Sequence, residues 1–166
     1  MLTAQGTLTV NAAFLQEIKD ENRELRQLLH DCDAALGKCT AAAADSASAD
    51  GPLDPKLALD LLMRLRNQLS LHFSLEETYG YFDDAVQVTP QLADRALKLR
   101  GQHSELFLSF CGLVDHAEQA TNDGRTDALP DVARQFTDFH ARFQEHESLE
   151  TELIVQVLNE EIGCGD

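Results

Sequence analysis

The sequence has few aromatic and few basic residues, and both shortages exclude classes of protein. Trp is absent and Tyr occurs twice, while Leu, Ala, Glu, Gln and Arg dominate the long segments. Because β-sheets favour aromatic and β-branched residues, this composition disfavours a sheet protein and favours helices. The chain has 13 Lys and Arg residues against 29 Asp and Glu residues, which gives a formal net charge of -16. Such a charge repels phosphate backbones and anionic membrane surfaces, so we expect neither nucleic acid nor a membrane as a partner.

Long apolar runs and paired cysteines are also absent. No run approaches the roughly 20 apolar residues that a membrane-spanning helix needs. The first ten residues, MLTAQGTLTV, have neither a basic leader nor the apolar block of a signal peptide, so we expect a cytoplasmic protein. The four cysteines form no CxxC pair, which argues against a zinc ribbon or a disulfide framework and favours reduced thiols.

Helix breakers divide the chain into four predicted helices. Asn11 is a potential N-cap of the first helix. Gly37 is expected to end this helix before a polar loop that closes with Gly51-Pro52, and a continuation through Ala41 to Ala44 is the alternative. Asp54-Pro55 and Thr89-Pro90 are start signals for the second and third helices. The predicted helices span residues 12–36, 55–79, 90–120 and 130–161 of one domain, residues 11–162, with residues 1–10 as an N-terminal extension and 163–166 as a C-terminal tail. Short connections between long helices favour an all-α fold, an antiparallel up-down-up-down four-helix bundle.

Apolar residues recur at alternating spacings of three and four along each predicted helix, and this periodicity marks the buried seam. Each seam is interrupted by polar residues at one place. The interruptions are Asn22 on the first helix, His72 and Glu76 on the second, His103 on the third, and His146 and Glu150 on the fourth. In an antiparallel bundle, neighbouring interruptions lie at similar distances from the loops that join their helices. The sequence therefore predicts one polar layer across the bundle.

A polar layer can serve simply to fix the register of helices, as a single buried Asn does in a coiled coil. Two carboxylates and three imidazoles exceed that need, because each loses much hydration free energy on burial unless it is paired. A His and a Glu at positions i and i+4 project from the same helix face, so each such pair can reach one metal ion. We interpret the layer as a metal site. Nitrogen and carboxylate donors without a thiolate favour iron, with manganese or zinc as alternatives.

Three segments resemble the motifs of a known family. HFSLEE at His72, QHSELF at His103 and HESLETE at His146 resemble the second, third and fourth helix motifs of hemerythrin-like (HHE cation-binding) domains. The resemblance extends over nearly the whole chain and implies a non-haem di-iron centre that is open to O2 or a related small ligand. On the matching positions, Glu76 and Glu150 would bridge the two irons. His72 would bind one iron, and His103 with His146 would bind the other.

Two positions depart from the family pattern. Hemerythrin proper has a second His four residues after the first on helix three, where this chain has Phe107, although many domains of the family also lack it. The family also has a His in the seam of helix one, where this chain has Asn22. The register favours Asn22 as the helix-one partner, through its amide oxygen or a bound water. His30, two turns away and off the apolar stripe, is the alternative.

The function that these features predict is an iron-binding module that binds or senses O2, NO or peroxide. We expect no catalytic residue, because the sequence shows no separate acid–base apparatus. A di-iron enzyme that acts on peroxide or in iron supply and repair is the first alternative, and a metal-free interaction bundle with a degenerate site is the second. The residues beside the seams are expected to be flank or outer residues rather than ligands. These are Glu77, His116, His140 and Glu147.

Overall fold

The structure, a computed structural model, describes the backbone of residues 12–41, 54–78 and 90–163, and the side chains of residues 22–38, 54–78 and 91–156. These residues form four α-helices and one short 3-10 helix, without a strand. The elements are α1 (Ala12–Ala41), α2 (Pro55–Thr78), α4 (Pro90–Asn122), η1 (Thr126–Ala128) and α5 (Leu129–Gly163). The expected N-terminal extension, Asn11, the Gly51-Pro52 loop and Thr89 lie outside the described residues.

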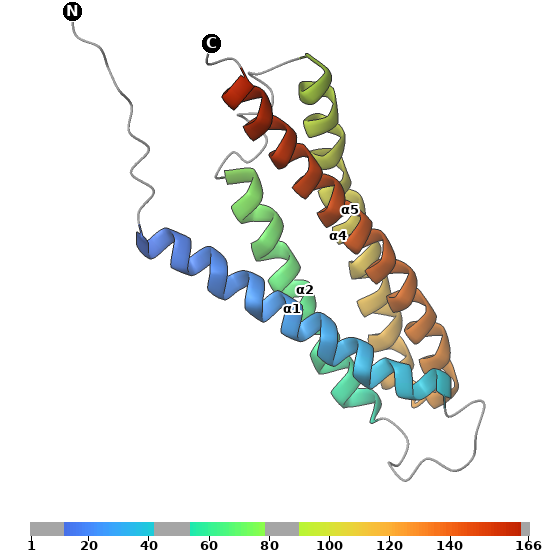
Figure 1. The fold of residues 1–166 in the computed structure, drawn as a ribbon. Helices are drawn as coiled ribbons and strands as arrows, with labels where there is room; N and C mark the ends of the chain where they lie inside the picture. Colours follow the sequence, from blue (N-terminus) through green and yellow to red (C-terminus); the bar gives the residue numbers. More distant parts are fainter. Residues whose placement is uncertain (1–11, 42–53, 79–89, 164–166) are drawn as a thin grey trace, which may run out of the picture.

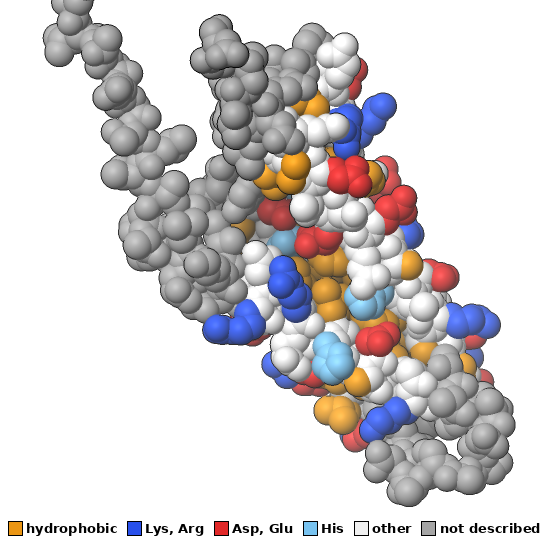
Figure 2. Space-filling view, viewed as in Figure 1, with side chains coloured by type: hydrophobic (Ala, Val, Ile, Leu, Met, Phe, Trp, Pro, Cys, Tyr) orange, Lys and Arg blue, Asp and Glu red, His pale blue; other side chains and the backbone are white. Residues whose placement is uncertain are grey.

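The helices alternate in direction, and each packs mainly against two neighbours in the cyclic order α1, α2, α4, α5 (Figure 1). The predicted all-α, antiparallel up-down-up-down bundle is therefore confirmed. The C-terminal end of α1 lies beside the start of α5, whereas the N-terminal end of α1 diverges from the C-terminal half of α5. On the face shown in Figure 2, hydrophobic side chains are exposed between α1 and α5, bordered by histidine and charged side chains. None of the described helices has both the length and the apolar character needed to cross a membrane.

The start of α2 and the end of α1 differ in how well the sequence predicts them. Asp54 caps α2 as expected, because its Oδ1 accepts the backbone N–H of Lys56 at 2.9 Å and Pro55 is the first helical residue. The expected stop at Gly37 is wrong, since α1 continues through this residue to Ala41. Glycine lowers helix stability by about 1 kcal/mol relative to alanine but keeps its N–H, so a helix can continue through it.

The end of α4 has the turn that its sequence predicts. Gly124 adopts a positive φ of 67°, which an L side chain rarely adopts. The backbone N–H of Arg125 donates to Ala120 O at 2.8 Å, and that of Gly124 donates to Thr121 O at 3.2 Å, as in a Schellman motif. The chain then passes through η1 into α5, which starts at Leu129 with Pro130 in its first turn.

The predicted seams are buried in the parts of the helices whose side chains are described, except that Asn22 and Glu76 are half-buried. Among the described side chains, a large hydrophobic cluster draws on all four helices, whereas a small one draws on α4 and α5. Along α4, Leu99 belongs to the small cluster, Leu106 belongs to the large cluster, and His103 lies between them. The pair His146 and Glu150 separates the two clusters along α5 in the same way. The polar residues of α4 and α5 therefore lie at one level between the two clusters, as the sequence predicts for these helices.

Candidate metal centre

Within the described residues, two groups of imidazole and carboxylate side chains could hold a metal ion, and they share Glu76. The inner group consists of Glu76, His103, His146 and Glu150. The outer group consists of His72, Glu76 and Glu147. In each group the candidate ligand atoms all lie within 4.8 Å of one another. The structure thus brings together all five polar seam residues predicted on α2, α4 and α5, and it adds one that the sequence placed on a flank.

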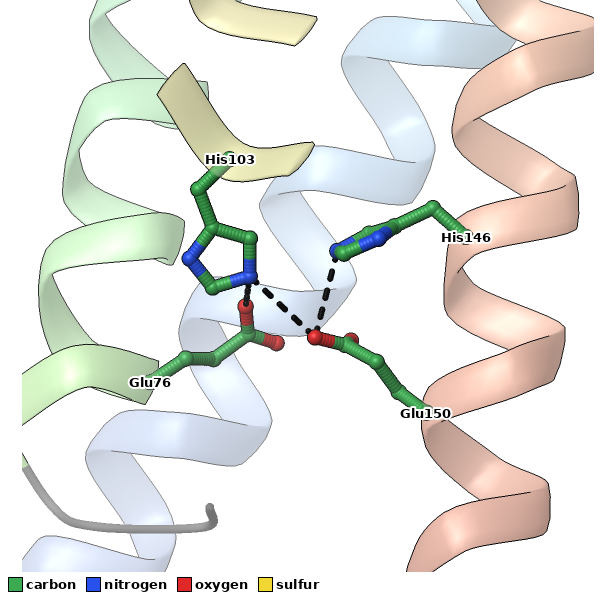
Figure 3. A group of neighbouring side chains, drawn as sticks. All are labelled: Glu76, His103, His146 and Glu150. Carbon is green, nitrogen blue, oxygen red and sulfur yellow. Dashed lines mark hydrogen bonds and ion pairs between the residues drawn. The ribbon is translucent and has the colours of Figure 1, made fainter. Parts of the chain in front are cut away.

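The inner group converges from three helices (Figure 3). His103 Nε2 of α4 lies 3.4 Å from Glu76 Oε2 of α2 and 3.2 Å from Glu150 Oε1 of α5. His146 Nε2 lies 3.1 Å from the same oxygen of Glu150. Both imidazoles and Glu150 are buried. Four potential ligands therefore converge on one place, and three of them are buried.

Two features of the inner group bear on charge and hydrogen bonding. Burial alone would raise the pKa of Glu150, but the imidazoles of His103 and His146 outweigh this effect and lower the pKa from 4.5 to about 2. Glu150 is therefore a carboxylate at neutral pH. His146 Nε2 is buried and makes no hydrogen bond to the described residues, although it points towards Glu150. A buried nitrogen without a hydrogen bond is rare in folded proteins, and a bound cation would satisfy it.

The other nitrogen of each inner imidazole contacts an outer acceptor. His103 Nδ1 lies 3.2 Å from Glu77 Oε1, and His146 Nδ1 lies 2.9 Å from Gln102 Oε1. These acceptors favour the tautomer with the proton on Nδ1, which leaves the Nε2 lone pair directed into the inner group. Glu77 thus contacts an imidazole of the inner group without belonging to the group, as expected. Gln102 was not predicted, because its only signal in the sequence is its place beside a seam histidine.

The outer group is more open than the inner one. His72 Nε2 lies 3.1 Å from Glu76 Oε1 and 3.0 Å from Glu147 Oε1. The side chain of His72 is 5% exposed, whereas that of Glu147 is 36% exposed. The sequence placed Glu147 on a flank, because it directly follows the seam residue His146 and its contact with α2 depends on how the helices pack.

Two aromatic rings of the large hydrophobic cluster pack directly against the imidazoles of the two groups. Phe73 stacks on His103 with ring centroids 4.6 Å apart, and Phe143 packs edge-on against His72 at 5.8 Å. Phe143 was expected in the seam, whereas the position of Phe73 was not predicted. Apolar walls of this kind keep water away from buried polar groups and so strengthen electrostatic interactions between them.

The helix-one candidates lie apart from these contacts. His30 is exposed and belongs to neither group. Asn22 is half-buried and lines a hollow with three other residues of α1, namely Arg23, Arg26 and Gln27. A helix-one ligand stays a prediction. Of the remaining histidines, His116 Nδ1 contacts Gln135 Nε2 at 3.0 Å and the His140 ring packs on Phe136, which agrees with flank positions.

The residues of both groups fit a metal ion. Bonds of about 2.0–2.2 Å from a metal to nitrogen or oxygen place neighbouring ligand atoms about 3 Å apart in octahedral geometry, and somewhat farther apart in tetrahedral geometry. The imidazole-to-carboxylate distances in the two groups lie between 3.0 and 3.4 Å. Imidazole and carboxylate ligands without thiolate suit iron, manganese or zinc.

Comparison with known proteins gives one match. The family model described as the hemerythrin HHE cation-binding domain matches residues 13–158, a range that contains every residue of both groups. No curated protein and no solved structure matches the chain.

Proposed function

The chain belongs to the hemerythrin HHE cation-binding family, and we propose that its two groups hold a non-haem di-iron centre that binds or senses O2, NO or a related small oxidant. The shared residue Glu76 carries this proposal. Its Oε1 faces His72 at 3.1 Å and its Oε2 faces His103 at 3.4 Å, so its two oxygens serve different groups. This is the arrangement expected of a carboxylate that bridges two metal ions.

Each residue has a role in this proposal. Glu76 would be shared by the two metals, His72 would hold the outer metal, and His103, His146 and Glu150 would hold the inner one. Glu150, which the resemblance implies as a second bridge, belongs to the inner group only among the described residues. Bound iron would supply redox chemistry and an open coordination position. The chain's own contribution is to hold the ligands, to fix the imidazole tautomers through outer acceptors and to exclude water with aromatic rings. Manganese and zinc are the competing metals, because the same ligand types accept them.

The setting of this function is also a proposal. The net charge of -16 supports a protein that binds neither nucleic acid nor membrane surfaces. A small diatomic or peroxide ligand and a cytoplasmic location complete the proposal. A metal-free interaction bundle explains the observations less well, because it leaves His146 Nε2 buried without a hydrogen bond in the described residues.

Metal analysis tests the function directly. The protein is expressed in iron-replete medium and purified without chelators, and we expect a content approaching two irons per chain and an absorption change on exposure to air or NO. Less than about 0.2 iron per chain, with no manganese or zinc in its place, would contradict the proposal. Sustained turnover of added peroxide would instead favour the enzyme alternative.

A further inference from the structure

Among the described residues, the outer group has fewer ligands than the inner group, and Glu147 is one of them. Apart from the shared Glu76, the inner group contains two imidazoles and one carboxylate, whereas the outer group contains His72 and Glu147. His30 of α1, the nearest histidine in sequence to the expected helix-one position, belongs to neither group. Without Glu147, the outer metal would have one imidazole and a shared carboxylate as its ligands from the described side chains.

The geometry of α5 explains how one turn can serve both groups. Consecutive residues of an α-helix point about 100° apart, since 3.6 residues make one turn. His146 is directed into the inner group, and the next residue, Glu147, is directed towards His72 of α2. His72 Nε2 lies almost equally far from Glu147 Oε1 and Glu76 Oε1, at 3.0 and 3.1 Å. These three atoms have the spacing of neighbouring ligands around one ion.

Charge supports the same assignment. Two divalent cations in a partly buried site need several negative groups nearby, because isolated charges are poorly stabilised in an apolar interior. Glu76 and Glu150 supply two negative charges and Glu147 supplies a third. Because its side chain remains 36% exposed, Glu147 loses less hydration on taking this position than a fully buried carboxylate would.

Glu147 also connects the outer group with solvent. It lines a hollow of about 370 Å³ between α1 and α5, together with Leu29, His30, His140 and Phe143. This hollow lies among the histidine and hydrophobic side chains on the face shown in Figure 2. The inner group, by contrast, consists of buried side chains apart from the half-buried Glu76.

From these observations we propose that Glu147 is a third protein ligand of the outer metal, supplied by α5 where the family has a helix-one histidine. The outer metal would then have two carboxylates and one imidazole, whereas the inner one would have two of each. The outer metal would be the one reached from the hollow between α1 and α5. This assignment rests on the proposed two-metal function and adds a ligand to it.

Titration of metal-free protein with Co2+ tests the assignment. The number of tightly bound ions is measured by equilibrium dialysis, and the visible absorption of Co2+ reports its ligands. We expect two bound ions in the wild type and one in Glu147→Gln, with affinity for the second ion reduced by more than about 100-fold. Loss of a residue that only hydrogen-bonds to a metal ligand already reduces affinity about 10–100-fold. Glutamine can still accept a hydrogen bond from His72, so a role of Glu147 as a mere hydrogen-bond acceptor would leave two ions bound.

Two control variants separate the outcomes. Glu145→Gln removes a charge from an exposed residue of the same turn that belongs to neither group, and it should bind two ions. His30→Ala alters the hollow without removing a ligand and should also bind two ions. Two ions of unchanged affinity in Glu147→Gln would overturn the assignment and leave the two-metal function intact. Fewer than two ions in the wild type would contradict the two-metal function and, with it, the assignment.

Discussion

The inner and the outer group share Glu76 but differ in how they are held. In the inner group, each imidazole has an outer acceptor on its second nitrogen, Glu77 for His103 and Gln102 for His146. The outer group has one imidazole and the partly exposed Glu147 beside a hollow. A buried and anchored site favours retention of a metal, whereas an accessible one favours exchange and ligand entry. Both groups use imidazole and carboxylate, so it is their surroundings that suit them to different tasks.

The largest effect is expected from removal of the shared residue. Glu76→Ala takes a ligand from both groups, so both ions should be lost. The bundle should stay helical, because the apolar seams remain and a partly buried carboxylate adds little net stability. Metal content and far-ultraviolet circular dichroism measure the two effects. Retention of both ions would show that Glu76 is not a bridge, and loss of helicity in the metal-free variant would make the layer structural.

Removal of Glu150 should affect metal binding in the inner group more than in the outer group. Glu150→Ala leaves both inner imidazoles without the carboxylate that they approach at 3.1–3.2 Å, so the inner ion should be lost. The outer ion should remain with weaker binding, because His72, Glu76 and Glu147 are unchanged. Equilibrium dialysis with Co2+ should give about one ion per chain, since binding couples to an intact ligand set. If Glu150→Ala lost the outer ion and kept the inner one, Glu150 would be a ligand of the outer metal instead.

Substitution of the residues that accept hydrogen bonds from His103 and His146 should have a moderate effect on metal affinity. Glu77→Ala and Gln102→Ala each free an imidazole to rotate or to change tautomer, and each should weaken binding of the inner metal by about 10–100-fold. Competition with a chelator of known affinity measures this change. The matched variant Glu105→Ala, at an exposed position of α4 outside both groups, should leave the affinity unchanged. Equal affinities in all three variants would show that these acceptors do not hold the imidazoles.

The smallest change in metal binding is expected from substitutions in α1. Asn22→His would add an imidazole at the predicted seam level and should raise affinity for the outer metal by a few-fold, whereas His30→Ala should not change it. Iron content and absorption after exposure to air compare the variants. If His30→Ala removes iron and Asn22→His has no effect, the predicted register of helix one is wrong and His30 is its ligand.

The sequence predicts the features that depend on periodicity and misses those that depend on packing between helices. The five polar residues of α2, α4 and α5 interrupt otherwise apolar seams, so their meeting at one level is a consequence of helix geometry. They are His72, Glu76, His103, His146 and Glu150. Gln102 and Glu147 lie beside the seam, and whether such residues reach a neighbouring helix depends on the rotation of both helices. The end of α1 was predicted too early, at Gly37, for another reason, because a single glycine disfavours a helix by less than the surrounding residues can offset.

The division of the hydrophobic core has a consequence for local unfolding. Among the side chains that the structure describes, the large cluster joins all four helices, whereas the small cluster beyond the polar layer joins α4 and α5. Among these described residues, opening of the small cluster gives up fewer apolar contacts than opening of the large one, so we expect the segments around Leu99 and Leu153 to unfold locally at lower free energy. A metal ion bound in the layer would oppose that opening. Amide hydrogen exchange around Leu99 and Leu153 should therefore slow on metal binding, while exchange around Phe110 and Phe136 changes little. Release of the metal can then proceed through transient local unfolding around the small cluster.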